Sequence, residues 1–221
     1  MRDYFVGDIN DFMKYDLLEK INHYLMKKIL IVWMKTTGDG NKLDYLKNLN
    51  YKEYNKELHD NLSEIIENNK RTIKQVKNIK SLKGYLSFDE ELTNNQIKRK
   101  EYFNNVKKLL KDIDLVFFDP DNGIVPNKNK KRKKEYVYWD EMLEIWKEEK
   151  DLLIYQHFPH KNHKIFIEKL KRECEENISN SYVYFFESDF VVFILLSHQK
   201  KEEAIGKIME YWNKLVRIGK E

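Results

Sequence analysis

Two carboxylates and an amide follow directly on an apolar segment near the middle of the chain. Residues 115–118 are Leu-Val-Phe-Phe, and the next five residues are Asp119, Pro120, Asp121, Asn122 and Gly123. Two carboxyl groups this close push their pKa values apart, so one can act as a general base while the other keeps its proton. We expect Asp119 to be the main catalytic carboxylate, with Asp121 and Asn122 orienting water or a sugar. Asp-Pro and Asn-Gly also favour turns, so a purely structural turn is the alternative.

A second polar loop follows the apolar residues 152–155. Gln156 and His157 leave this segment, and further histidines stand at positions 160 and 163. Three histidines at this spacing approach one metal ion only in a helix, which Pro159 opposes, and no cysteine or acidic ligand accompanies them. We therefore expect no metal site. Instead, His157 and Gln156 are expected to contact the substrate or to protonate it.

A run of cations comes shortly after the two carboxylates. Six of the seven residues 128–134 are lysine or arginine. Cations beside a catalytic loop can neutralise the phosphates of a nucleic acid and fix it over the site. On this hypothesis the phosphates are bound by Lys130, Lys131, Arg132, Lys133 and Lys134; the alternative is a solvated loop. Tyr138 follows in an alternating aromatic stretch, where it either stacks on a base or packs as a half-buried strand residue.

The elements that must position these loops are three apolar runs, at residues 29–34, 115–118 and 152–155. Unbroken apolar runs are typical of parallel strands that helices cover on both faces. Each run ends in a polar loop, and ligands of open α/β sheets gather outside the carboxyl ends of the strands. We therefore predict a mostly parallel α/β sheet whose three loops face one crevice.

The rest of the chain supplies the helices and the edge of this predicted sheet. Apolar spacing predicts a helix over 8–26, capped by Asp8 or Asn10, and two later helices over 165–174 and 202–216. The region 47–111 is rich in Lys, Glu and Asn and is predicted to be a helical insertion or subdomain. Residues 182–186 and 191–196 flank a short turn and predict an antiparallel hairpin at the sheet edge. All of this fits one α/β domain over residues 1–221.

The composition excludes several classes of protein. The chain has 221 residues, of which 41% are hydrophobic, with only 7 Gly and 3 Pro, so it is neither disordered nor collagen-like. No apolar run is long enough to span a membrane, and the opening residues lack the apolar stretch of a signal peptide. Cys174 is the single cysteine, which fits a reducing compartment. We expect a cytoplasmic protein, and its net charge of +4 permits an anionic partner.

Three segments together carry a resemblance to a known family. The opening from Gly7-Asp8 to Lys14, the later Gly38-Asp39-Gly40 and the strand that ends in Asp119-Pro120 follow one another in this order. This order resembles that of bacterial J-type ribosomal RNA adenine-N6 methyltransferases. The resemblance implies a methyltransferase-like Rossmann sheet with an antiparallel C-terminal hairpin. It also implies that Gly38 and Gly40 surround S-adenosylmethionine, that Lys14 lies near the cofactor and substrate, and that Asp119-Pro120 begins the catalytic tetrapeptide.

Two departures from the family pattern change the expected chemistry. Met34 stands where the family has an acidic residue, and Asp121-Asn122 stands where it has Pro-Tyr, whose aromatic ring clamps the target adenine. An asparagine offers no stacking face for a flipped base. An aspartate can instead activate water, and an asparagine can hold a sugar or a base edge.

The function predicted from these residues is that of an enzyme acting on DNA or RNA. We favour hydrolysis, with base excision by a glycosylase-type reaction without a cofactor ahead of Mg²⁺-dependent strand cleavage. A divergent S-adenosylmethionine-dependent methyltransferase is the first alternative. The second is an inactive nucleic-acid-binding protein that keeps only the groove and the basic loop.

Overall fold

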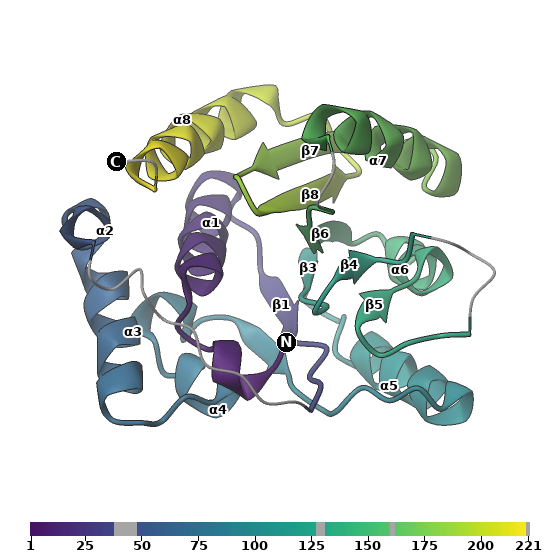
Figure 1. The fold of residues 1–221 in the computed structure, drawn as a ribbon. Helices are drawn as coiled ribbons and strands as arrows, with labels where there is room; N and C mark the ends of the chain where they lie inside the picture. The colour runs from purple at the N-terminus through teal and green to yellow at the C-terminus, as the bar shows by residue number, and fades with distance from the viewer. Residues whose placement is uncertain (38–47, 127–130, 160–161, 220–221) are drawn as a thin grey trace.

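The computed structural model describes residues 1–37, 48–126, 131–159 and 162–219. Within these residues, six strands form a central sheet in the order β2-β1-β3-β6-β8-β7 (Figure 1). Their bounds are Ile29–Val32 for β1, Leu86–Phe88 for β2, Leu115–Phe118 for β3, Asp151–His157 for β6, Tyr182–Glu187 for β7 and Val191–Ser197 for β8. Strands β2, β1, β3 and β6 are parallel to one another, and β8 runs antiparallel to both β6 and β7. The predicted α/β fold with a C-terminal hairpin is confirmed.

The three predicted apolar segments form adjacent strands in register. Val32 of β1 pairs with Phe118 of β3, which in turn pairs with Ile154 of β6. Every residue of β1 and β3 is buried, as expected for strands with helices on both faces. Because the strands are parallel, the loops that follow them meet at one edge of the sheet.

Two hydrophobic layers cover the opposite faces of the sheet. Alternate strand residues point to opposite sides, so Ile31 and Phe117 join one buried cluster while Val32 and Phe118 join the other. The first cluster includes helices α1, Ile9–Leu25, and α8, Glu202–Ile218. The second is covered by α5, Gln96–Lys108, α6, Trp139–Trp146, and α7, His163–Asn177. Figure 1 shows the two groups of helices on either side of the strands.

The region 47–111 is more than the predicted helical insertion. It contains α2, Leu49–Tyr54, α3, Lys56–Glu67, and α4, Ile73–Val76. It also contains β2, which pairs with β1 and extends the central sheet, and α5, which packs on the second face. The second half of the region therefore belongs to the main α/β layer structure.

Small elements complete the described chain. Single-turn helices lie at Asp3–Phe5 and Lys80–Leu82, and β4, Gly123–Ile124, pairs in parallel with β5, Tyr136–Val137. The predicted helices over 8–26, 165–174 and 202–216 correspond to α1, α7 and α8. In the part of the chain that the structure covers, no helix combines the length and the apolar character needed to cross a membrane.

Candidate active site

Lys14 lies at the centre of a buried group of charges. Its side chain is 3% exposed, and its Nζ donates to Asp11 Oδ1 at 2.8 Å and to Asp119 Oδ2 at 2.9 Å. Asp11 and Lys14 share one face of α1 because residues three apart on a helix are neighbours. Burial alone would lower the pKa of Lys14, but the two carboxylates hold it above its ordinary value. The lysine is therefore charged, and it connects α1 to the carboxyl end of β3.

Asp119 and Asp121 occupy different electrostatic environments although they are two residues apart. Burial raises the pKa of Asp119, and the neighbouring Lys14 ammonium limits the rise. Asp121 accepts hydrogen bonds from Thr36 Oγ1 at 2.6 Å and from Arg2 Nε at 3.1 Å. Although burial opposes its ionisation, the Met1 ammonium and the Thr36 hydroxyl lower the pKa of Asp121. One carboxyl is thus the better proton acceptor and the other stays ionised.

These groups line a small cavity at the carboxyl ends of β3 and β6. Its volume is about 80 Å³, and its polar lining consists of Asp8, Asn10, Asp11, Lys14, Asp119, Asp121, Tyr155 and His157. A volume of roughly 10–15 Å³ is enough for one water molecule, so the cavity has room for a few. Burial and the Asp11 carboxylate raise the pKa of Asp8 to about 7. The cavity therefore has room for water beside a carboxyl, that of Asp8, whose pKa lies near neutrality.

His157 stands at the end of β6, as the sequence predicts. Its Nε2 is 3.0 Å from the hydroxyl of Tyr155, which also lines the cavity. Burial and the positive charge of Lys14 lower the pKa of His157. The imidazole is therefore neutral at neutral pH.

Gln156, predicted to contact the substrate, lines a second cavity described below, but its amide makes its hydrogen bonds within the protein. Its side chain is buried, and Oε1 accepts from the backbone N–H of Ile124 at 2.7 Å. Its Nε2 donates to the carbonyls of Asn122 at 3.1 Å and of His157 at 2.7 Å. The amide is thus used within the protein, where it fixes the turn after Asp121.

A second cavity adjoins the first. Its volume is about 280 Å³, and it lies between the turn at Asn122, the end of β6 and helix α7. His157 lines both cavities. Asn122 is exposed and lines the second one, so the structure brings it together with His157 as predicted.

The basic segment, here residues 131–134, is linked to the strand end beside the first cavity through Thr36 and Thr37. Lys134 Nζ donates to Thr37 Oγ1 at 3.0 Å, and the adjacent Thr36 is hydrogen-bonded to Asp121. Lys131 and Lys133 are exposed. The predicted residues Lys130, Gly38 and Gly40 lie outside the described residues.

Arg132, predicted to bind phosphate, and Tyr138, predicted either to stack on a base or to pack, are both engaged inside the protein. Arg132 pairs with Asp140 and, at 2.7 Å, with Glu141. Its guanidinium lies 4.8 Å from the ring centroid of Tyr138, which is only 5% exposed. The Tyr138 ring is therefore packed and offers no open face for a base.

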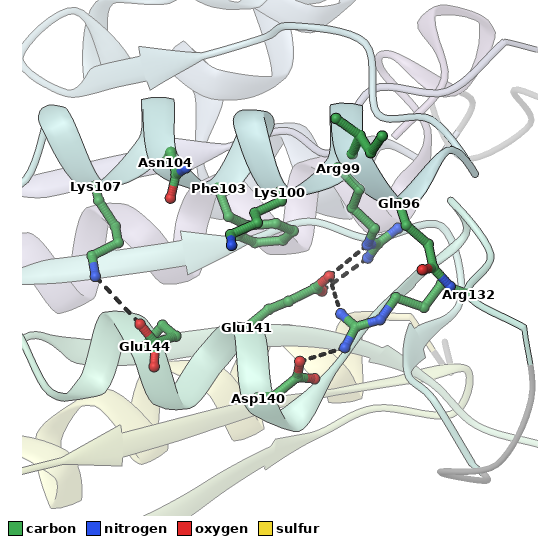
Figure 2. Close-up of a pocket in the computed structure, with 11 residues that line it drawn as sticks. Gln96, Arg99, Lys100, Phe103, Asn104, Lys107, Arg132, Asp140, Glu141 and Glu144 are labelled. Atoms are coloured by element: carbon green, nitrogen blue, oxygen red, sulfur yellow. Dashed lines mark hydrogen bonds and ion pairs between the residues drawn. The ribbon is translucent and has the colours of Figure 1, made fainter.

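Arg99 holds this arrangement together from α5. Its side chain is 2% exposed and binds both carboxylate oxygens of Glu141, at 2.5 and 2.9 Å. It also donates to the carbonyls of Lys133 at 3.2 Å and of Tyr136 at 2.6 Å. Figure 2 shows Arg99 and Arg132 converging on Glu141. The role of Arg99 was not predicted from the sequence, because nothing local distinguishes this residue among the cations around it.

A cavity of about 790 Å³ between α5 and α6 surrounds this cluster. Cations and carboxylates pair across it, as Lys107 and Glu144 do at 3.4 Å (Figure 2). Its charges therefore largely serve to hold the two helices together. Over the described ranges, no three or more histidine, cysteine or acidic side chains are placed to hold a metal ion.

The fold and the site together define an α/β protein with a Rossmann-like sheet and a charged cavity at the carboxyl ends of its parallel strands. Comparisons with protein-family models, with curated proteins and with solved structures gave no match.

Proposed function

We propose that the protein is a nucleic-acid hydrolase that releases a base by cleaving its N-glycosidic bond. The observation that carries the proposal is the cavity of about 80 Å³ beside Asp119, Asp121 and His157. It has the size for water, and it places carboxyls with opposite pKa shifts around that water. A carboxyl that accepts a proton beside one that stays ionised suits acid–base catalysis of hydrolysis.

In the proposed step, Asp119 takes a proton from a water molecule in the cavity. The water oxygen bonds to C1′ of the sugar, and the C1′–N bond breaks. Its electron pair leaves with the base, which takes up a proton from solvent. The raised pKa of Asp119 favours proton transfer to it. The ionised Asp121 stabilises the positive charge that develops on the sugar during cleavage.

A nucleic-acid substrate is supported by the position of the basic segment. Lys134 donates a hydrogen bond to Thr37, and the adjacent Thr36 donates one to Asp121. The exposed Lys131 and Lys133 belong to the same segment, so phosphates bound there would lie next to the cavity.

Methyl transfer is the second candidate, because the sheet ends in an antiparallel hairpin of the kind that the family resemblance implies. S-adenosylmethionine does not fit the described residues at the ends of β1 and β3. Met1 lies across these ends, with its amine donating to the carbonyls of Met34 and Asp119. The cavity of about 80 Å³ is far below the roughly 300–1,000 Å³ of a typical ligand site.

The experiment is a product assay on single- and double-stranded DNA and RNA oligonucleotides. Released base is measured by chromatography for the wild type, for Asp119→Asn and for the exposed control Asp112→Asn. We expect base release by the wild type and the control only. A parallel calorimetric titration with S-adenosylmethionine, together with an assay for methyl transfer to the same oligonucleotides, tests the second candidate. Methyl incorporation without base release would replace the proposed hydrolysis, and binding without any product would leave a nucleic-acid-binding protein.

A further inference from the structure

We infer that the second cavity is a binding pocket for one nucleobase, an inference that rests on the proposed function and specifies where its substrate is held. The cavity has a volume of about 280 Å³, just below the roughly 300–1,000 Å³ of sites for drug-sized ligands. It therefore suits a single ring system. A base taken out of its stack needs such a pocket, with apolar faces and a polar group at its edge.

Aromatic and aliphatic side chains form the walls of this pocket. Phe158 and Phe166 are half-buried with ring centroids 5.8 Å apart. Phe158 is held in place by His163, which stacks on it at 3.9 Å with an interplanar angle of 7°. Ile124 and Leu170 are buried and also line the pocket. These surfaces match the flat, weakly hydrated faces of a base.

One amide supplies the polar edge. The Asn122 side chain is exposed and lines the pocket, while its backbone is fixed on both sides. Its N–H donates to the carbonyl of Glu135 at 2.9 Å, and its carbonyl accepts from Gln156 at 3.1 Å. A side-chain amide offers one donor and one acceptor together, which is the pattern that a base edge requires. The opposite wall carries Lys169 and Glu173, which pair with each other at 3.5 Å.

The position of the pocket links it to the proposed chemistry. His157 lines both this pocket and the carboxylate cavity. A base bound between Phe166 and Asn122 would thus direct its sugar toward His157 and the carboxylates. In this arrangement the second cavity holds the leaving base and the first cavity holds the water.

The test is binding of single nucleosides by calorimetry and ligand-observed NMR, with adenosine, guanosine, cytidine, uridine and thymidine as probes. Asn122→Ala changes an exposed side chain, and Phe166→Leu keeps apolar volume but removes the aromatic face. We expect each to weaken binding of the preferred nucleoside about tenfold or more. Phe190→Ala is the matched control, because Phe190 is 68% exposed and does not line the pocket. It should leave binding unchanged.

The outcomes separate this inference from the proposed function. Nucleoside binding that Asn122→Ala and Phe166→Leu weaken supports the pocket even where no base is released. Base release that depends on Asp119 but has an unchanged KM in both pocket variants would overturn the pocket and leave the hydrolase standing. The pocket would also be overturned if the protein bound none of the nucleosides and bound no free base in the presence of an oligonucleotide that contains an abasic site.

Discussion

Gly123 and Gln156 fit together so closely that a side chain at position 123 would have to displace the Gln156 amide. A β-carbon there would lie 2.3 Å from Oε1 of Gln156, and the backbone of Gly123 has a φ of +102°. The same amide oxygen accepts the N–H of Ile124. The turn that carries Asp121 and Asn122 is therefore fixed from β6 by one side chain.

Gly123→Ala is expected to destabilise the protein by at least about 1–3 kcal/mol, since strain from the positive φ adds to the clash with Gln156. Chemical denaturation measures the change. Gly206→Ala in α8 is the matched control, because an added β-carbon there meets nothing within 4 Å. It should stabilise the helix by up to about 1 kcal/mol. Equal stability of the two variants would contradict the fixed turn.

Asp8 is expected to make the protein less stable as the pH rises. Its pKa of about 7 in the folded protein lies above the ordinary 3.8. The folded state thus keeps a proton that the unfolded chain has lost, so this contribution is complete below about pH 3.8 and is lost as pH rises through about 7. Asp8→Asn keeps a helix-capping side chain and should make the stability of the protein fall less steeply as the pH rises.

Denaturation of this variant between pH 4 and 8 gives the comparison. The control Asp112→Asn removes the same charge from an exposed position and should keep the pH dependence of the wild type. A fall in stability that is as steep in Asp8→Asn as in the wild type would count against a proton held at Asp8.

Arg99→Ala should cost about 3–5 kcal/mol, because it leaves the buried Glu141 without its main partner. It also removes the donors to the carbonyls of Lys133 and Tyr136, which fix the basic segment. Lys107→Ala breaks ion pairs that are one-third to one-half exposed and should cost less than about 1 kcal/mol. Urea unfolding of both variants measures the difference. Similar losses of stability in the two variants would contradict the role of Arg99 in holding Glu141 and the basic segment in place.

Replacing Lys131, Lys133 and Lys134 by alanine should weaken nucleic-acid binding and flatten its salt dependence. Each lost phosphate contact reduces the slope of log K against log salt by about 0.9 for duplex DNA. Fluorescence anisotropy over a salt series measures the slope. The control replaces Lys207, Lys214 and Arg217 of α8, which removes the same charge elsewhere. An identical effect of both triple variants would show that only net charge matters.

The sequence predicted the central strands because β1 and β3 are unbroken apolar runs and β6 contains one at residues 152–155. It did not predict β2, whose three residues Leu-Ser-Phe lack a distinctive pattern and become a strand only by pairing with β1. The charged site was partly predicted. Asp119 and His157 stand at strand ends, whereas the contact of Lys14 with Asp119 joins residues 105 positions apart and depends on the whole fold.

Three residues predicted to contact the substrate are engaged inside the protein for a common physical reason. Gln156, Arg132 and Tyr138 have the chemistry to bind a substrate, but the structure gives each of them a partner inside the protein. Whether a polar group is used internally depends on loops that fold back from elsewhere in the chain. Asp8 is the opposite case. It was expected only to cap a helix, but in the structure it also lines the first cavity.

The most direct test of the account is the single-turnover rate of base release by Asp119→Asn. Loss of the Asp119 carboxylate should lower this rate at least about 100-fold below that of the wild type, with a retained circular dichroism spectrum and unchanged oligonucleotide binding. Asp112→Asn should match the wild type. Base release by Asp119→Asn at the wild-type rate, or no base release by the wild type from any DNA or RNA substrate, would contradict hydrolysis at this site.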